Sequence, residues 1–270
     1  MTARPPDPNE VPAYTELLRL DGTTFIVAGG GQGIGRQTCH ALAAAGAHVV
    51  CVDRDEELAR TVAGEVGGTP AVADITTRAG VREVLDLAES LGRPLRGIVD
   101  IVGIARFKDL SDLDDEDWTW NLDMNARHAF LFATEGGARL VAGGGGSIVF
   151  IASASGMVAA DRHAVYGMAK AAVISLVKSA SVELGPAGVR VNCVSPGVVW
   201  TPRMSEKIGE ERRSSYEALS PLGRVAYPSD IASTVLFLSS DLASMISGQN
   251  IVVDGAALNR SPFMVGNFTS

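Results

Sequence analysis

The sequence predicts an α/β fold: a single doubly wound parallel sheet of the Rossmann type with helices on both faces. Two observations predict it. Short, almost purely apolar segments alternate with longer helical segments along nearly the whole chain, and such segments are typical of parallel strands covered on both faces. No linker divides the alternation, so one large domain fits the 270 residues better than two small ones.

The expected elements follow one another in regular order. The first apolar segment, 23–28, ends in glycines, and the first helix, 33–45, stops at Gly46, a residue that commonly ends a helix. About seven strands are expected, at 23–28, 47–52, 70–73, 97–102, 148–152, 189–194 and 250–253. The expected helices cover 33–45, 56–66, 78–91, 114–141, 164–184 and 228–239.

Two stretches depart from this order. Residues 140–160 carry no charge and are long enough to span a bilayer, but glycines and serines interrupt them, so a buried strand at 148–152 is the better interpretation. Residues 196–227 interrupt the alternation after the sixth strand, which is typical of a substrate-binding loop. We therefore expect one domain at 20–258, preceded by an extension at 1–19 and followed by a tail at 259–270.

The composition argues against several classes of protein. The net charge is −8 and no dense block of Lys and Arg occurs, which disfavours a nucleic-acid binder. Cys39, Cys51 and Cys193 lie far apart with no CxxC motif, so buried thiols in a reducing compartment are expected. The four histidines do not cluster at metal-ligand spacing, and the polar N-terminus lacks the apolar core of a secretory signal. We expect a cytoplasmic protein without a metal or membrane site.

The turn after the first strand has the composition of a dinucleotide site. Gly29, Gly33 and Gly35 form the pattern G-x-x-x-G-x-G, with Gln32 and Ile34 between them, where a strand passes into a helix. Glycines let the backbone turn tightly and approach a pyrophosphate at the helix N-terminus. The turn therefore predicts cofactor phosphates at the start of the first helix.

Residues at the ends of the second and third strands indicate which cofactor. Asp53 can accept hydrogen bonds from the adenosine ribose hydroxyls and would repel the 2′-phosphate of NADP. Gln32 stands where a basic residue would help to hold that phosphate, so both residues favour NAD, although Arg54 could turn toward a phosphate. Asp74 and Ile75 are expected to contact adenine, with a simple turn aspartate as the alternative for Asp74.

The candidate chemical groups are a tyrosine and a lysine. Tyr166 and Lys170 lie four residues apart in an expected helix and share one face. At about 5 Å and an effective dielectric constant of about 20, the lysine charge would lower the pKa of the phenol by about two pH units, toward the range useful for general acid–base catalysis. Ser153 ends the fifth strand, where its hydroxyl could hold a substrate oxygen beside the phenol.

With these residues in place, the chain resembles the short-chain dehydrogenase/reductase (SDR) family over about residues 20–257. Besides the glycine turn, Asn125 and Ser153, the resemblance is carried by Tyr166-Gly167-Met168-Ala169-Lys170, by Val191-Asn192-Cys193-Val194-Ser195-Pro196-Gly197, and by Ser247-Gly248-Gln249 with Val253-Asp254-Gly255.

The resemblance implies a role for each residue. Tyr166 would exchange the proton with the substrate oxygen, Lys170 would lower the pKa of Tyr166 and bind the nicotinamide ribose, and Ser153 would orient the substrate. Asn125 would place a water that links Lys170 to solvent. The remaining cofactor contacts that the resemblance implies are Gly103, Pro196, Gly197, Val199 and Thr201.

Two positions depart from the family pattern. Ala28 stands where the family usually has Thr. Asp100-Ile101-Val102-Gly103 stands where the family has Asn-Asn-Ala-Gly, and only the glycine is kept. An ionised aspartate accepts hydrogen bonds but cannot donate them, so the hydrogen bonds that brace the sheet at Asp100 must differ, and Val102 would crowd the path of the cofactor.

The expected function is an NAD-dependent interconversion of a secondary alcohol and a ketone. Met157, Val158, Trp200 and Met204 would line the substrate cleft, with His163 as a further candidate, and indicate an apolar or amphipathic substrate such as a steroid, lipid or cyclic alcohol. The alternatives are an NADPH-dependent 3-oxoacyl thioester reductase and a catalytically idle NAD-binding regulator. Resemblance of the helices 114–141 and 164–184 to those of the family implies a homodimer or homotetramer, with the tail at 261–270 covering a neighbouring subunit.

Overall fold

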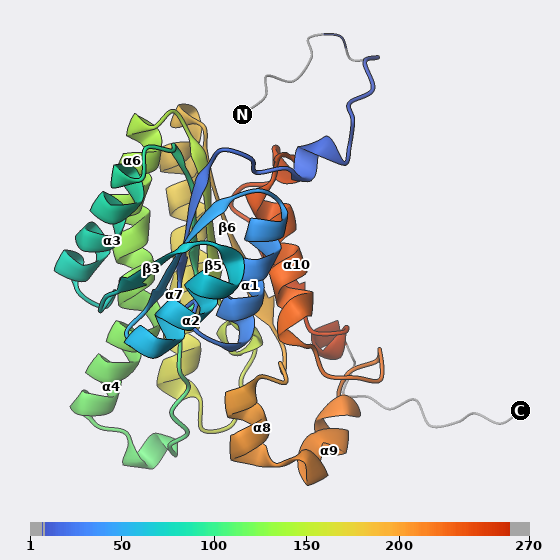
Figure 1. The fold of residues 1–270 in the computed structure, drawn as a ribbon. Helices are drawn as coiled ribbons and strands as arrows, with labels where there is room; N and C mark the ends of the chain where they lie inside the picture. The colour runs from blue at the N-terminus through green and yellow to red at the C-terminus, as the bar shows by residue number, and fades with distance from the viewer. Residues whose placement is uncertain (1–6, 8, 260–270) are drawn as a thin grey trace, which may run out of the picture.

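The computed structural model describes residue 7 and residues 9–259, and it confirms the doubly wound parallel sheet (Figure 1). The strand order is β3-β2-β1-β4-β5-β6-β7, and every neighbouring pair of strands is parallel. The strands are β1 (Thr24–Ala28), β2 (His48–Asp53), β3 (Thr69–Val72), β4 (Leu95–Asp100), β5 (Gly146–Ile151), β6 (Val189–Pro196) and β7 (Asn250–Val253).

Helices cover both faces of this sheet (Figure 1). One face carries α1 (Gly33–Ala44), α2 (Glu56–Val66) and α10 (Pro228–Ser239). The other carries α3 (Arg78–Ser90), α4 (Asp115–Leu122), α5 (His128–Leu131), α6 (Gly137–Ala142) and α7 (Ala164–Leu184).

The alternation of side chains along each strand divides the core in two. In β1, Ile26 and Ala28 pack toward α3 and α7, whereas Phe25 and Val27 pack toward α1 and α10. All four side chains are essentially inaccessible to solvent. Since successive side chains of a strand point to opposite faces, a strand buried on both faces must be apolar throughout, which is why the strands could be recognised in the sequence.

The expected helix at 114–141 is continuous, but its α-helical hydrogen-bonding pattern is interrupted twice. Two π-helical turns, Asp123–Arg127 and Phe132–Gly136, separate α4, α5 and α6. In the first of them, the buried side chain of Asn125 donates to the carbonyl of Asn121 at 3.1 Å. Single π turns inside α-helices are frequent at functional sites, and this one delivers Asn125 to the carboxyl edge of the sheet.

Two other segments differ from the sequence expectation. Strand β4 ends at Asp100, so Ile101, Val102 and Gly103 form a loop at the carboxyl edge and not the end of the strand. The segment 196–227, expected to be irregular, contains two short helices, α8 (Pro202–Ile208) and α9 (Arg213–Glu217). The helix α8 is close to the strand ends (Figure 1), and Thr201 begins it by accepting a hydrogen bond from the amide of Met204 at 3.2 Å.

The longest helix also carries the candidate chemistry. Among the described residues, Ala164–Ala187 forms one helical stretch long and apolar enough to cross a membrane by length and composition alone. Val173 and Val177 of this stretch are buried in the core against the sheet, and core helices pass the same test. The expected tail contact at 261–270 lies outside the described residues.

Candidate active site

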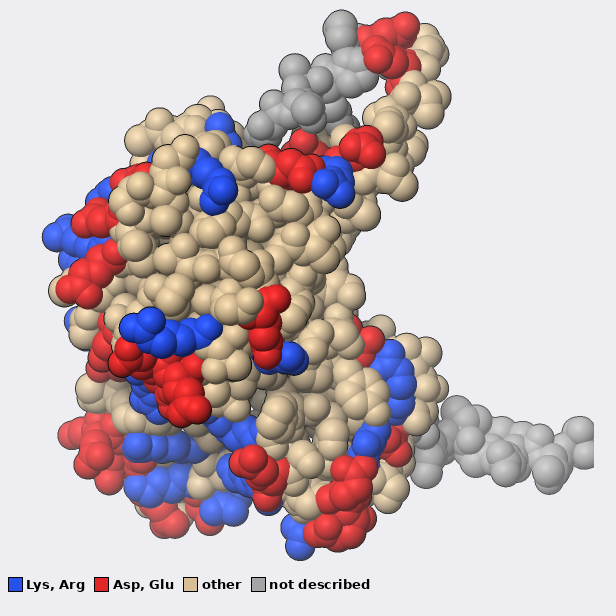
Figure 2. All heavy atoms as spheres, in the orientation of Figure 1, with Lys and Arg blue, Asp and Glu red and all other residues tan. Residues whose placement is uncertain are grey.

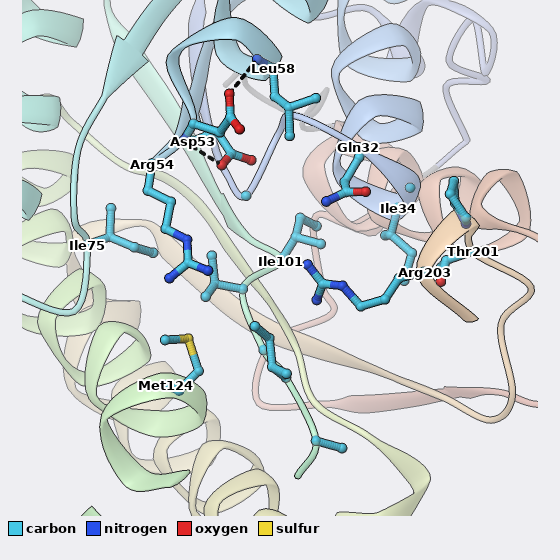
Figure 3. A pocket seen from close by; sticks show the side chains of 18 of the residues that line it. Gln32, Ile34, Asp53, Arg54, Leu58, Ile75, Ile101, Met124, Thr201 and Arg203 are labelled. Carbon is cyan, nitrogen blue, oxygen red and sulfur yellow. Dashed lines mark hydrogen bonds between the residues drawn. The ribbon is translucent and has the colours of Figure 1, made fainter. Parts of the chain in front are cut away.

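A cavity of about 550 Å³ opens at the carboxyl edge of the sheet (Figure 3). In an open parallel sheet, this edge is where ligands bind, at the point where the strand order reverses. Here the reversal lies between β1 and β4. The expected residues that line the cavity are Gly29, Gln32, Gly33, Ile34, Asp53, Arg54, Asp74, Ile75, Gly103, Tyr166, Val199 and Thr201.

The glycine turn is shaped by close backbone packing. Gly29 has a φ of +78°, a conformation that other residues rarely adopt. A Cβ on Gly35 would lie only 1.9 Å from the carbonyl oxygen of Gly29, so Gly35 has to be glycine for α1 to start this close to the turn. Gly35 thus supports the cavity from behind without lining it. A Cβ on Gly33 would lie 3.6 Å from Cγ2 of Thr201, the residue that begins α8, so this threonine borders the glycine turn.

The carboxylate of Asp53 is held in place at the end of β2. Its Oδ2 accepts a hydrogen bond from the amide of Gly31 at 3.1 Å, and its Oδ1 accepts one from Asp55 at 3.1 Å. The Asp74 carboxylate is used differently, since it accepts from both the amide and the hydroxyl of Thr76. Asp74 is therefore a turn aspartate, which was the alternative interpretation from the sequence, and it also lines the cavity.

Helix α7 and strand β5 bring Ser153, Tyr166 and Lys170 together. The Ser153 hydroxyl hydrogen-bonds the phenol of Tyr166 and accepts from the amide of Ser155 at 3.1 Å. The Nζ of Lys170 lies 6.0 Å from the centre of the Tyr166 ring. Lys170 is 2% exposed, and its ammonium donates to the carbonyl of Ile151 at 2.8 Å.

Burial shifts the pKa values of Tyr166 and Lys170, an effect that the residue spacing alone does not reveal. The pKa of Tyr166 is raised above its ordinary value, because burial disfavours the phenolate more than the hydrogen bond from Ser153 favours it. Burial likewise lowers the pKa of Lys170 to about 8, against an opposing effect of the Asp100 carboxylate. The lowering of the Tyr166 pKa expected from Lys170 is thus absent from the free chain, since burial of the phenol is the largest effect on its pKa.

Asn125 and Lys170 meet at Gly103. A Cβ on Gly103 would lie 2.7 Å from Lys170 Nζ and 3.0 Å from Asn125 Oδ1. Asn125 accepts a hydrogen bond from the amide of Ile104 at 2.9 Å and donates to the Ile104 carbonyl at 3.0 Å. The amide of Asn125 therefore fixes the loop after β4 against the lysine, and only a glycine leaves room between the two side chains.

A column of four side chains, in contact one after another, leads from helix α8 to Tyr166 on the expected substrate side of the cavity. The Lys207 ammonium of α8 lies 3.9 Å from the Phe107 ring centre. Phe107 stacks on His163 at 4.5 Å, and His163 on Tyr166 at 5.3 Å. His163 also contacts the hydroxyl of Ser155. A second hollow beside this column is lined by Met157, Val158 and His163, among others.

Not every expected residue lines the main cavity, and some lining residues were not foreseen. Expected residues that are absent from its wall include Gly35, Asn125, Ser153, Lys170, Pro196, Gly197 and Trp200, whereas Val102 lines it as expected. The unforeseen lining residues include Leu58, Ile101, Ile104, Phe107, Met124 and Lys207. Most of them stand just beyond the end of a strand or in the segment after Pro196, and that position is the only signal the sequence offered. Arg203, foreseen only as part of the substrate segment, projects into the cavity near Gln32 (Figure 3).

The surface around the site has no single sign of charge. Lys and Arg side chains alternate with Asp and Glu over the face shown in Figure 2. Many of the charges are paired, for example Arg36 with Glu65 and Arg224 with Asp230.

Comparison with known proteins gives the family. The family profile described as "Enoyl-(Acyl carrier protein) reductase" matches residues 28–256. The chain is 36% identical to D-threitol dehydrogenase of Mycolicibacterium smegmatis over 88% of this chain and 94% of that protein. It is 31% identical to NAD-dependent glycerol dehydrogenase of Listeria innocua over 90% of this chain and 96% of the relative.

Comparison with solved structures indicates the same family. A 7α-hydroxysteroid dehydrogenase complexed with NADH and 7-oxo glycochenodeoxycholic acid superimposes with a TM-score of 0.84 at 31% identity, covering 89% of this chain and 96% of that chain. The chain therefore belongs to the short-chain dehydrogenase/reductase family. It is an oxidoreductase that acts on CH–OH groups.

Proposed function

We propose that the protein interconverts a secondary alcohol and a ketone with NAD(H) as its cofactor. The observation that carries the proposal is the convergence of Ser153, Tyr166 and Lys170 beside a cavity that the glycine turn and Asp53 line at its other end. The turn fits a pyrophosphate, because Gly29 and Gly33 line the cavity without side chains where helix α1 begins. When bound, the nicotinamide supplies the site that accepts or donates hydride.

The residues of the chain handle the proton. Ser153 holds the substrate oxygen next to Tyr166; the phenolate of Tyr166 takes the hydroxyl proton during oxidation, and the resulting phenol returns it during reduction. Lys170 holds the nicotinamide ribose and stabilises the phenolate. In the free chain the pKa of Tyr166 is raised by burial, so a positive charge brought into the site is needed to make the phenol acidic.

We further propose NAD over NADP. The support is Asp53, whose carboxylate is fixed by the Gly31 amide and cannot turn away from a 2′-phosphate without breaking that hydrogen bond. Gln32 adds no charge that would attract a phosphate. Arg54 and Arg203 line the same cavity, and a preference for NADPH would assign them to the phosphate and favour the 3-oxoacyl reductase alternative.

The proposed substrate is an apolar or amphipathic alcohol. Phe107, Met157 and Val158 are each between 44% and 48% exposed along the column that leads to Tyr166, an arrangement suited to a hydrophobic ring or chain. A second candidate is a small polyol, and the similarity to threitol and glycerol dehydrogenases favours it.

A panel assay tests these proposals. Steroid, cyclic and aliphatic secondary alcohols are compared with threitol and glycerol, each with NAD and with NADP. We expect the highest kcat/KM for an apolar alcohol with NAD. Highest activity on polyols would replace the substrate proposal by the second candidate.

The variant Tyr166→Phe separates an enzyme from an NAD-binding regulator. We expect turnover to fall by at least about 10²-fold, as for loss of a general acid–base group, while NADH binding measured by fluorescence persists. Wild-type binding of NADH without turnover of any alcohol in the panel would favour the regulator.

We also propose the organisation of the whole chain. The catalytic domain covers residues 20–258, with an extension at 1–19 and a tail at 259–270, and the protein is cytoplasmic. The exposed apolar side chains of Trp118 on α4 and of Met168 and Val182 on α7 support a homodimer or homotetramer built on these helices. Light scattering that gives a monomeric mass would rule out this assembly.

A further inference from the structure

A buried carboxyl–imidazole pair lies beneath the catalytic lysine. Asp100, at the end of β4, is 1% exposed, and His128, at the start of α5, is 2% exposed. The Nδ1 of His128 lies 2.5 Å from Oδ2 of Asp100. A carboxylate without a partner would be costly at such a depth, so His128 is the group that allows Asp100 to be there.

The hydrogen bonds define how many protons the pair holds. The Nε2 of His128 lies 3.1 Å from the carbonyl oxygen of Met124, and a carbonyl oxygen can only accept, so Nε2 carries a proton. The contact between Nδ1 and Asp100 needs a second proton, either on the imidazole or on the carboxyl. In both arrangements the pair has no net charge.

The pair is connected to Lys170 through one residue, Val102. Asp100 Oδ1 accepts a hydrogen bond from the amide of Val102 at 3.2 Å. The carbonyl of the same residue, Val102, lies 3.4 Å from Lys170 Nζ. A Cβ on the next residue, Gly103, would lie only 2.7 Å from Lys170 Nζ. Asp100 therefore anchors the loop that flanks the lysine on its β4 side.

We propose that His128 is a positioning residue for the reaction: it neutralises Asp100, so that this carboxyl can anchor the Val102 peptide against Lys170 without adding a net negative charge to the active site. The inference rests on the proposed role of Lys170. An unneutralised carboxylate at Asp100 would favour the charged form of Lys170, so the neutralisation of Asp100 by His128 bears directly on the lysine.

Other groups around the pair do not supply the positive charge that neutralises Asp100. Lys170 faces Tyr166 of its own helix and Cys193 of β6, and burial raises the pKa of the Cys193 thiol to about 12, so that thiol is neutral at physiological pH. Several charged groups on the elements around His128 are paired with one another, namely Asp123 with Arg127, and Glu135 with Arg78 and Arg82.

A double-mutant cycle tests the proposal with substitutions that preserve hydrogen bonds. In His128→Asn, the new amide can still donate to Asp100, but the positive partner is lost. In Asp100→Asn, the amide oxygen still accepts from Val102 and the amide nitrogen donates to a neutral His128. The double variant is uncharged. His48→Asn is the matched control, because His48 lies on β2 and contacts Thr69.

The direct readout is the titration of Lys170. The chain has four lysines, so the ¹³Cε resonance of Lys170 can be assigned with Lys170→Met and followed by NMR against pH. We expect His128→Asn to raise the pKa of Lys170 by about one pH unit, the effect of a buried unit charge within roughly 10 Å. The Asp100→Asn variant, the double variant and His48→Asn should stay within about half a pH unit of the wild type.

The pH dependence of kcat/KM gives a second readout. Added negative charge raises the pKa of both Tyr166 and Lys170, so both limbs of the profile should move to higher pH in His128→Asn and return in the double variant. A merely structural defect would lower activity without this paired movement. An unshifted Lys170 titration in His128→Asn, or the same shift in the double variant, would overturn the proposal. If the wild type oxidises no alcohol with NAD, the proposed function fails, and the NMR titration still decides whether His128 neutralises Asp100.

Discussion

The charge of Lys170 should make the protein less stable at neutral pH than at alkaline pH. Burial lowers the pKa of this lysine from 10.5 to about 8. One pH unit of difference between the folded and the unfolded chain corresponds to about 1.36 kcal/mol, so keeping the ammonium in the core costs about 3 kcal/mol at pH 7. The unfolded chain binds the proton more tightly. The cost is therefore fully present below about pH 8 and disappears as the pH rises toward 10.5.

The variant Lys170→Met isolates this effect, because methionine fills a similar volume without a charge. The substitution also removes the hydrogen bonds to Ile151 and Val102, which offsets part of the gain, so the prediction concerns the dependence on pH. Between pH 7 and about pH 9.5, the free energy of unfolding of the wild type should rise by about 2 kcal/mol relative to Lys170→Met.

Urea unfolding followed by circular dichroism at several pH values measures this difference. Lys178→Met is the control, since Lys178 lies on the same helix with an exposed side chain, and its stability should follow that of the wild type at every pH. Parallel curves for the wild type and Lys170→Met would show that the buried lysine has no depressed pKa, and the reasoning about the site would be refuted.

Three further predictions concern the cofactor end and the phenol. Gly35→Ala should abolish NADH binding measured by fluorescence and lower Tm, because the new Cβ would lie 1.9 Å from the Gly29 oxygen; unchanged binding would contradict the close packing of the turn. Asp53→Asn should weaken NADH binding by about tenfold and reduce discrimination against NADPH, since the charge is lost while the acceptor for Gly31 is kept; an unchanged ratio of the two affinities would count against Asp53 as the selecting residue. In the free protein Tyr166 should ionise above its ordinary pKa of about 10, because burial disfavours the phenolate. The difference in phenolate absorbance between the wild type and Tyr166→Phe should therefore appear only above that pH. A difference that appears near neutral pH without cofactor would contradict this prediction.

The sequence determined the architecture and the place of the chemistry. Strands buried on both faces must be apolar throughout, so Phe25, Ile26 and Val27 could be assigned to a buried strand without a structure. A spacing of four residues places Tyr166 and Lys170 on one helix face in any context. These properties are local or periodic, and a one-dimensional pattern is enough to reveal them.

Tertiary structure decided the electrostatics and the partners. The sequence argument gave Lys170 a full charge and let it lower the pKa of Tyr166, whereas burial raises the pKa of the phenol and lowers that of the amine. The pattern marked Asp100 as a departure, but its partner His128 lies 28 positions away and was not distinguished from an ordinary core histidine. Desolvation depends on everything that surrounds a group, and a contact between distant residues exists only once the chain has folded. For these physical reasons neither property could be obtained from residue order alone.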